Sequence, residues 1–393
     1  MTDSTLVEEA GRLFDDTVAL RRRIHAQPET GNELPATQAT ILEALDGLGL
    51  SIETGRKLSS VVAVLDGDEP GPTTLLRGDM DALEMPEDTG LPFASSIDGR
   101  MHACGHDTHV AMLVGAARIL SARRAQLRGR VVFMFQPGEE GHGGARVMLD
   151  EGLLDRHGTI DRAFAIHSIA NLPSGLVTTR GGTLMASADE FRITVTGQGG
   201  HASMPHDAVD PVPVACEIVT ALQAMVTRRV PAFDPAVLTV TRIQTGTAFN
   251  VIPEVARCDG TIRAVSDASR DLVVAGLREV ATHVATAHRC SAEVELADNG
   301  YPVTVNDEEA AARTIATAAS LLGPDRVMQM PTPVMGAEDW SYVLREVPGS
   351  MAFLGVARAD DPHPAPNHSN RMMVDEQAMV TGVALHAAMA LAP

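Results

Sequence analysis

The order of strand-like and helix-like segments constrains the fold of this chain more than any other feature. Two segments carry apolar residues at helical spacing, 5–27 and 37–50. Four short β-branched or aliphatic runs follow, with a helical segment at 110–122 between the second and third. The four runs span 61–65, 73–76, 131–135 and 163–166. Because strands alternate with helices here, we expect an α/β fold with a mostly parallel sheet flanked by helices.

A second pattern begins near residue 185. Its segments follow the order strand, helix, strand, strand, helix, strand, at 190–196, 211–228, 237–243, 255–262, 272–287 and 292–296. This order is typical of a ferredoxin-like α+β unit. Helix and strand signals then resume, at 307–322, 339–344, 351–354 and 376–391. We therefore predict a discontinuous domain, residues 1–185 and 299–393, interrupted by a ferredoxin-like insertion at 186–298.

Length and composition fit a two-part globular chain. At 393 residues the chain exceeds what one hydrophobic core usually supports. Its hydrophobic content of 45% and charged content of 21% are ordinary, and no stretch approaches the roughly 18 apolar residues of a membrane span. Residues 1–25 lack the basic start and apolar run of a secretory signal. We expect no membrane association and a location in the cytoplasm.

Charge and cysteine content narrow the function further. The formal net charge of −20 argues against nucleic acid as a partner, since binding to phosphate backbones depends on clustered Lys and Arg. The cysteines are too few and too scattered for a disulfide framework. They are Cys104, Cys216, Cys258 and Cys290. Only Cys104 lies among other residue types that bind metals.

The densest chemical signal is the segment from His102 to His109, which reads His-Ala-Cys-Gly-His-Asp-Thr-His. Thiolate and imidazole ligands suit zinc and neighbouring transition metals. The alternative is a helix entry whose histidines only cap and hydrogen-bond. Three histidines and one cysteine within eight residues favour the metal site.

Two adjacent carboxylates, Glu139 and Glu140, follow the apolar run that ends at Phe135. At the carboxyl end of a parallel strand such groups face the usual ligand crevice. Neighbouring residues there point in different directions, so one glutamate can bind a metal while the other moves protons. For an isolated Glu-Glu pair, an exposed acidic turn is the more ordinary interpretation.

Two further histidines, His167 and His368, end or follow strand-like runs. A lone histidine in such a place is more often structural than a ligand. The whole set, however, offers five ligands of mixed type, Cys104, His106, Glu140, His167 and His368. Five ligands are too many for one tetrahedral ion and suit two ions that share a bridging water.

Asp79 and Asp81 end another strand-like run, in the sequence Arg-Gly-Asp-Met-Asp-Ala-Leu from Arg77 to Leu83. Their carboxylates are either metal ligands or groups that fix the tautomer and orientation of an imidazole. We favour the second role.

Residues 197–202 of the insertion nominally fit a dinucleotide fingerprint, which must open a helix. Pro205 and Pro211 interrupt the stretch that follows, so we reject a nicotinamide site. His201 is instead placed on a glycine-rich loop, whose backbone can approach a ligand closely and bend.

Together these residues resemble the M20 metallopeptidase family, and specifically its amidohydrolase branch of aminoacylase-like, hippurate-hydrolase-like and auxin-conjugate-hydrolase-like enzymes. The resemblance runs nearly end to end through ordered motifs. They are Arg77–Leu83, His102–His109, Gln136–Glu140, His167, Gly199–Ser203, Asn250–Pro253, Gly336–Asp339 and His368–Ser369.

The resemblance implies a catalytic α/β domain that binds two divalent ions, zinc, manganese, cobalt or nickel, through the five ligands named above. It implies a ferredoxin-like lid or dimerisation domain, and hence a homodimer or larger homo-oligomer. Glu139 becomes the general base, with Asp81 beside it among the catalytic residues. Asn250 and Arg263 match positions that grip a substrate carboxylate. His201 matches a histidine that donates to the carbonyl oxygen, sometimes across a dimer interface.

The chain departs from the branch at two places. Where Asp-Ala-Leu-Pro is usual, it has Glu84, with Pro86 two places later, and Asn370 stands where a proline commonly follows the final His-Ser. Neither departure touches an implied ligand, so both bear on the rim of the pocket and on substrate choice.

The expected reaction is metal-assisted hydrolysis of the amide bond of an N-acyl amino acid, a small-molecule substrate, to a carboxylic acid and a free amino acid. One alternative is a dipeptidase or carboxypeptidase that uses the same dinuclear site. Another is a non-catalytic metal-binding regulatory protein, which has no need of Glu139 beside a ligand. The sequence leaves open the acyl group, the amino acid, the metal, and whether His201 acts in cis or in trans.

Overall fold

The computed structural model describes residues 4–392, which divide into two compact units. Unit 1 holds the described residues up to Leu184, Val305–Thr332 and the described residues from Asp339 onward. Unit 2 holds Met185–Thr304 and Pro333–Glu338. The predicted insertion, 186–298, lies within unit 2. No helix among residues 4–392 has both the length and the apolar character to cross a membrane.

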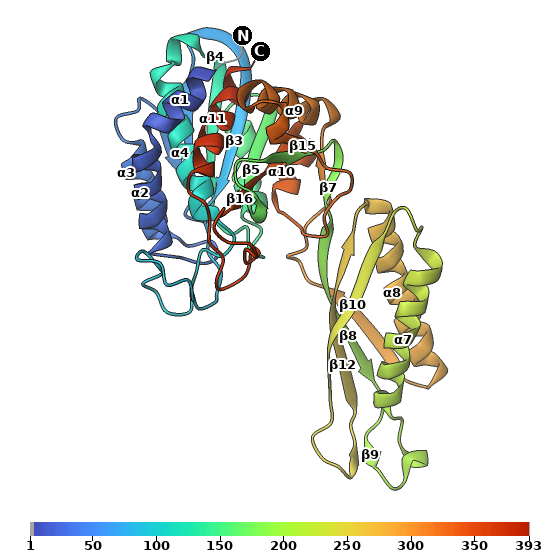
Figure 1. The fold of residues 1–393 in the computed structure, drawn as a ribbon. Helices are drawn as coiled ribbons and strands as arrows, with labels where there is room; N and C mark the ends of the chain where they lie inside the picture. The colour runs from blue at the N-terminus through green and yellow to red at the C-terminus, as the bar shows by residue number, and fades with distance from the viewer. Residues whose placement is uncertain (1–3, 393) are drawn as a thin grey trace. The chain divides into compact units, whose positions relative to one another are not determined.

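The core of unit 1 is an eight-stranded sheet (Figure 1). Its strands, in spatial order, are β1 (Ser51–Thr54), β2 (Val61–Asp66), β4 (Arg128–Gln136), β3 (Glu69–Asp79), β5 (Arg162–Pro173), β16 (Gly349–Ala357), β6 (Val177–Thr179) and β15 (Val327–Gln329). Strands β4, β3, β5 and β16 form a continuous parallel centre, and β6 and β15 are parallel to each other. The other neighbours are antiparallel. The predicted mostly parallel α/β sheet is thus confirmed.

Helices flank this sheet on the pattern that the sequence predicts. They are α1 (Ser4–Arg12), α2 (Phe14–His25), α3 (Pro35–Leu45), α4 (His106–Ala122), α5 (Gly144–Asp150), α6 (Leu153–Arg156), α9 (Glu308–Leu322), α10 (Trp340–Glu346) and α11 (Ala378–Leu391). Short 3-10 turns lie at η1 (Arg124–Gln126) and η3 (Pro324–Arg326). A small two-stranded sheet pairs β7 (Gly182–Met185) with β14 (Thr304–Asn306).

Two predicted helices are wrong in detail. The segment 5–27 is two helices, because the backbone at Leu13 leaves helical geometry and its N–H is shared between the carbonyls of Glu9 and Ala10. The segment 37–50 stops being helical at Leu45. Gly47 and Gly49 follow with φ of 73° and 70°, the left-handed conformation that ends helices at low cost.

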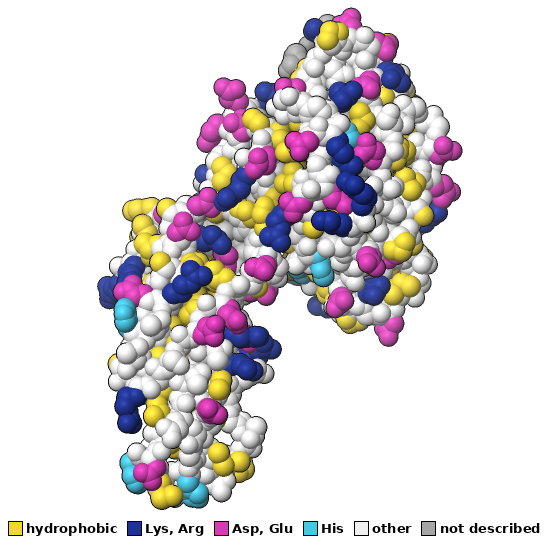
Figure 2. Space-filling view, turned by 180° about the vertical axis from the view of Figure 1, so that it is seen from behind, with side chains coloured by type: hydrophobic (Ala, Val, Ile, Leu, Met, Phe, Trp, Pro, Cys, Tyr) yellow, Lys and Arg dark blue, Asp and Glu magenta, His cyan; other side chains and the backbone are white. Residues whose placement is uncertain are grey.

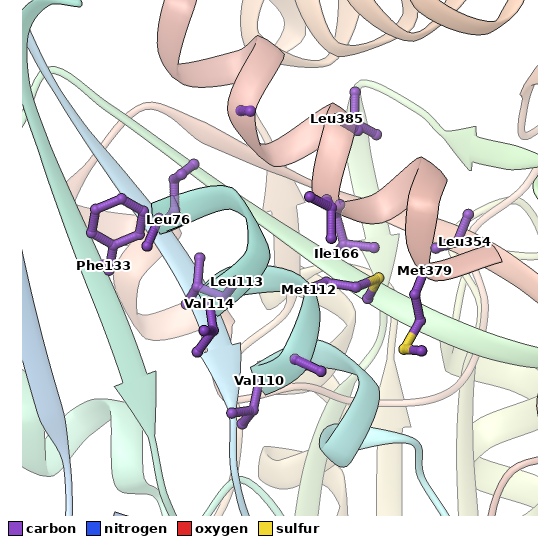
Figure 3. Close-up of a cluster of buried hydrophobic side chains, with 14 of the residues drawn as sticks. Leu76, Val110, Met112, Leu113, Val114, Phe133, Ile166, Leu354, Met379 and Leu385 are labelled. Carbon is purple, nitrogen blue, oxygen red and sulfur yellow. The ribbon is translucent and has the colours of Figure 1, made fainter. Parts of the chain in front are cut away.

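Helices α4 and α11 pack against each other over the sheet, and Figure 3 shows the apolar side chains between them. Met112 of α4 lies between Ile166 of β5 and Met379 of α11, while Leu113 lies near Leu76 of β3. Glycine makes the close approach possible, because a Cβ on Gly115 would lie 2.7 Å from Val383 Cγ2. Burial of this kind contributes roughly 25 cal/mol per Å² of apolar surface.

Unit 2 contains a four-stranded antiparallel sheet covered on one face by two helices (Figure 1). The strands, in spatial order, are β10 (Ala236–Thr245), β12 (Val255–Ala264), β8 (Ser187–Thr196) and β13 (Ser291–Leu296), and the helices are α7 (Pro211–Arg229) and α8 (Asp267–Ala287). Side chains of β8 alternate between buried and less buried, as expected for a sheet with one covered face. The predicted ferredoxin-like order of elements is confirmed.

Three short elements lie at one end of this sheet, beyond Thr196 and Val255. They are β9 (Gly200–His201), η2 (Pro205–Asp207) and β11 (Val251–Ile252), with β9 and β11 paired. We call them the tip of unit 2. In Figure 2 histidine and hydrophobic side chains lie close together at this end. The large exposed hydrophobic residues there are Met204, Phe249 and Val251.

Candidate active site

Six of the sequence-predicted site residues meet in unit 1, where the loops after β3 and β4 approach β5 and the start of α4. Cys104, His106 and His167 present ligand atoms within 4.8 Å of one another, and so do Cys104, Glu140 and His368. A third such group joins His106 with Glu139 and Glu140. The groups share members, so the side chains form one continuous cluster, as the sequence predicts.

Two histidines of this cluster, His106 and His167, use Nδ1 for a backbone hydrogen bond and leave Nε2 on the side of Cys104. His106 Nδ1 donates to the carbonyl oxygen of Asp81 at 2.8 Å, and His167 Nδ1 donates to the carbonyl of Ser168 at 3.0 Å. A carbonyl only accepts, so each ring carries its proton on Nδ1 and leaves Nε2 as an electron-pair donor. His167 Nε2 lies 3.5 Å from Cys104 Sγ. This is the arrangement of metal-binding imidazoles held by a backbone carbonyl.

His106 gives a test of whether a cation fits here. Its Nε2 is buried and has no hydrogen-bond partner among residues 4–392, although Asp79 Oδ2 lies 3.4 Å away and Glu140 Oε1 4.0 Å away. A buried nitrogen without a partner costs about 1–3 kcal/mol. A divalent ion between this nitrogen, the thiolate and the carboxylate would remove that cost, so the residues present fit a metal.

The electrostatics agree with this fit. Hydrogen bonds to Cys104 and Glu140 raise the pKa of His368 to about 10. The pKa of His106 also lies well above its ordinary value, because the charges of Asp79 and Cys104 outweigh the opposing effect of burial. Burial, followed by the charge of His109, holds the pKa of His167 well below its ordinary value. The anionic groups of the cluster therefore favour positive charge at His106 and His368, while His167 stays neutral and can bind a metal ion.

Asp81 holds the turn that presents both glutamates. Its two carboxylate oxygens accept the backbone N–H groups of Glu139 and Glu140, each at 3.0 Å. Gly138, just before them, has a φ of 72°, and a Cβ there would lie 1.9 Å from Asn32 Oδ1. Only glycine therefore fits this turn. The geometry supports an orienting role for Asp81 rather than direct metal binding.

Asp79 and His109 form a second, fully bonded layer beside the cluster. Asp79 Oδ1 lies 2.5 Å from His109 Nδ1, and His109 Nε2 accepts the backbone N–H of Ser168 at 2.8 Å. Both nitrogens of this ring are occupied, so His109 is not a ligand although it lies in the same motif. Arg77 donates to Asp79 at 2.6 Å, and despite burial this guanidinium holds the pKa of Asp79 well below its usual range.

Sequence reasoning gave no role to a buried network behind the glutamate turn. Asp339 accepts from Arg77 Nη2 at 3.2 Å, from Gln136 Nε2 at 2.7 Å and from the backbone N–H of Ala145 at 2.9 Å. Arg77 also donates to Gln136 at 2.9 Å. The network ties β3, β4, α5 and the start of α10 together. Charged residues directly after apolar strands were the available signal, but the partners are remote in sequence.

A second buried network, at the first turn of α4, was also missed. Asp107 accepts from Arg21 Nε at 2.7 Å and lies 2.8 Å from His25 Nδ1, while His25 Nε2 lies 3.2 Å from Glu87 Oε1. Burial alone lowers the pKa of His25, but Asp107 and Glu87 raise it to about 9. Against the effect of burial, hydrogen bonds from His25, Thr89 and the backbone N–H of Ser95 lower the pKa of Glu87 to about 2. This ion network fixes the first turn of α4, which carries His106.

The remaining predicted site residues lie in unit 2, and the structure brings two of them together. His201 pairs with Val251 in the β9–β11 ladder, and the N–H of Ala202 donates to the carbonyl of Asn250 at 3.0 Å. Arg263 is on β12, opposite Ala188 of β8. It therefore lies at the other end of the sheet, remote from His201 and Asn250.

The sequence of this chain matches the model of one protein family and the sequences of several curated proteins. Residues 75–392 match Peptidase family M20/M25/M40. The chain is 36% identical to a Saccharolobus solfataricus protein named thermostable carboxypeptidase 2, over 98% of this chain and 97% of that protein. It is 38% identical to the Arabidopsis thaliana IAA-amino acid hydrolase ILR1-like 2, over 96% of this chain and 85% of that protein.

A solved structure gives the same result. A Bacillus subtilis protein described as a dinuclear metal binding peptidase from the M20 family superposes with a TM-score of 0.84 at 32% identity, covering 97% of this chain and 98% of that one. The family model covers residues 75–392, and the relatives and the solved structure match nearly the whole chain, so this chain belongs to peptidase family M20/M25/M40.

Proposed function

We propose that this chain is a metal-dependent amidohydrolase that cleaves the amide bond of N-acyl amino acids to a carboxylic acid and a free amino acid. The observation that carries the proposal is the pairing of Glu139 and Glu140 at the Cys104–His106–His167 cluster. One carboxylate can bind metal there while its neighbour handles protons. The relative named IAA-amino acid hydrolase, a protein named for an amino acid conjugate, supports this substrate class.

Two divalent ions would be held by the five ligands of the cluster, and zinc, manganese, cobalt and nickel all suit the donor set. When bound, such ions polarise an amide carbonyl and make a water molecule more acidic. The ligand Cys104 must stay reduced for this purpose, which fits the proposed location in the cytoplasm.

Glu139 is the proposed general base. Its side chain is buried, and Asp81 holds its backbone in place. From this position the Glu139 carboxylate takes a proton from the attacking water and delivers it to the leaving nitrogen. Glu140, whose Oε1 lies 3.1 Å from His368 Nε2, is committed to the ligand cluster.

Unit 2 supplies the proposed substrate contacts. Arg263 and Asn250 bind the substrate carboxylate, and His201 donates a hydrogen bond to the carbonyl oxygen. Eight strand steps separate Val255 from Arg263 on β12, which is roughly 26 Å at about 3.3 Å per residue. An N-acyl amino acid is shorter than this, so we infer that the tip residues and Arg263 of one chain serve different substrate molecules. This favours a homodimer in which His201 acts in trans.

A substrate panel tests the proposed reaction. The protein is loaded separately with zinc, manganese, cobalt or nickel and assayed on N-acetyl amino acids, N-benzoyl amino acids, dipeptides and C-terminally extended peptides. Highest kcat/KM on N-acyl amino acids supports the proposal. The relative named carboxypeptidase keeps a peptidase as the second candidate, and higher kcat/KM on the peptides would establish it. No turnover with any substrate and metal would favour a non-catalytic metal-binding protein.

Mixing inactive variants tests action in trans. His201→Ala and Glu139→Gln chains are each expected to be inactive. A heterodimer of the two would contain one site with both residues intact, so activity should return. Heterodimers verified by differential tags that stay inactive would show that His201 acts within its own chain or not at all.

A further inference from the structure

The loop that carries His201 is a packed turn. The N–H of Met204 donates to the carbonyl of His201 at 2.8 Å, in addition to the β9–β11 pairing. A Cβ on Gly200 would lie 2.8 Å from Ala208 Cβ, and one on Gly197 would lie 2.1 Å from the carbonyl oxygen of Val209. These glycines are required by packing within unit 2, which differs from the expectation that they let the loop bend. The backbone of His201 is thus held in one place.

The ring of His201 is held by Ser203. The backbone N–H of Ser203 donates to His201 Nδ1 at 3.2 Å, and Ser203 Oγ lies 2.7 Å from the same nitrogen. A backbone N–H can donate but cannot accept. His201 Nδ1 must therefore be the acceptor, and the proton of the neutral ring lies on Nε2.

The opposite nitrogen is available to a ligand. The His201 side chain is exposed, and its Nε2 has no hydrogen-bond partner within the part of the chain that the structure describes. A group that stabilises a developing oxyanion must present a hydrogen, not a lone pair. With Nδ1 occupied by Ser203, the exposed Nε2 presents that hydrogen.

We propose that Ser203 is a positioning residue that holds His201 in the Nε2–H tautomer, so that His201 offers a fixed hydrogen-bond donor to the substrate carbonyl. Two donors on one nitrogen fix both the tautomer and the rotation of the ring. Without the hydroxyl, the ring keeps only the longer bond from the Ser203 amide. The consequence for turnover rests on the proposed function of His201, whereas the tautomer does not.

Nitrogen NMR of the full-length protein tests the tautomer directly. Histidine is labelled with ¹⁵N, and the signals of His201 are identified by their loss in His201→Gln. The wild type should show a pyridine-like Nδ1 and a pyrrole-like Nε2. Ser203→Ala should shift His201 toward a mixture of tautomers, and Ser203→Thr should restore the wild-type pattern. A protonated Nδ1 in the wild type, or an unchanged pattern in Ser203→Ala, overturns the proposal.

Kinetics on the best N-acyl amino acid test the consequence. Ser203→Ala should lower kcat about tenfold, which corresponds to loss of one well-placed hydrogen bond, with little change in KM. Ser203→Thr should recover most of the loss. Ser291→Ala, an exposed serine at the start of β13 in the same unit, is the matched control and should keep wild-type kcat.

The two measurements separate the possible failures. If His201→Ala retains its kcat, the proposed catalytic role of His201 is wrong, and the NMR pattern alone decides whether Ser203 positions the ring. If His201→Ala loses turnover but Ser203→Ala does not, His201 is catalytic and Ser203 is not its positioning residue.

Discussion

Replacing His386 by leucine should stabilise unit 1, and by more at pH 5 than at pH 8. His386 lies on α11 and is fully buried, and neither ring nitrogen has a hydrogen-bond partner among residues 4–392. Its ring packs edge-on against Phe164 at a centroid distance of 5.5 Å. Burial, with a smaller effect from the charge of His109, lowers the pKa of His386 from 6.5 to about 3.

The sign and size of the effect follow from proton linkage. Below pH 6.5 the unfolded chain binds a proton at His386 that the folded chain does not bind until near pH 3, so stability is lost as pH falls. At about 1.4 kcal/mol per pH unit, the cost of the histidine is about 2 kcal/mol at pH 5 and near zero at pH 8. Leucine removes this cost. At pH 8 the free energy of unfolding of His386→Leu should rise by only about 1 kcal/mol, because the substitution removes two buried polar atoms without partners. Any misfit of the leucine in the core reduces this gain.

Urea unfolding measures this difference. Trp340 is the only tryptophan of the chain and is buried in unit 1, so its fluorescence follows that unit. All samples contain a chelator, which keeps metal binding out of the comparison. His363→Leu, at an exposed position of the same unit, is the matched control and should show no pH-dependent gain. Equal stabilisation by His386→Leu at both pH values would contradict this prediction, because it would show that the buried ring binds a proton as readily as the unfolded chain does.

Three further predictions concern the networks and the substrate carboxylate. His25→Gln should lower the free energy of unfolding by about 3 kcal/mol at pH 6, and this difference should vanish as the pH rises through about 9. The reason is that the raised pKa of His25 stabilises the fold only while the ring is protonated. Urea titrations at pH 6 and pH 10 measure the difference. Asp339→Asn removes one of the two buried carboxylates that pair with Arg77, the other being Asp79, and turns an amide NH2 group toward the donors from which Asp339 now accepts. It should cost about 1–3 kcal/mol, read from the urea midpoint. Arg263→Ala should reduce kcat/KM for N-acyl amino acids far more than for their amides or esters, and equal losses would make Arg263 structural.

Much of the fold was predictable because its long helices and strands have recognisable apolar patterns in the local sequence. The runs that became β2 to β5 and the six elements of the ferredoxin-like unit carry clear apolar patterns. The short strands at or next to the edges of the sheet were not predicted, since the edge strand β1 is exposed along its length and β6 and β15 have only three residues each. Such strands exist through pairing with neighbours that are distant in sequence, which no local pattern reveals.

The candidate site likewise has features that the local sequence predicts and features that depend on distant residues. Its proposed ligands could be named from the sequence because cysteine, histidine and paired glutamates are conspicuous near strand ends. The supporting contacts were not found, because Asp339 lies 262 residues from Arg77 and His25 lies 82 residues from Asp107. His109 shares the ligand motif yet has both nitrogens bonded elsewhere, a distinction that only three-dimensional contacts can make.

Metal content and turnover of Glu139→Gln separate the roles proposed for the two adjacent glutamates. Glu140 is the proposed metal ligand and Glu139 the proposed proton carrier, and both lie in one cluster. Elemental analysis of the purified variant should give about two ions per chain, as in the wild type. Turnover of N-acyl amino acids should fall by about a hundredfold or more, since an amide keeps the shape of the side chain but cannot carry the proton. Loss of metal from Glu139→Gln, or turnover close to that of the wild type, would contradict the account.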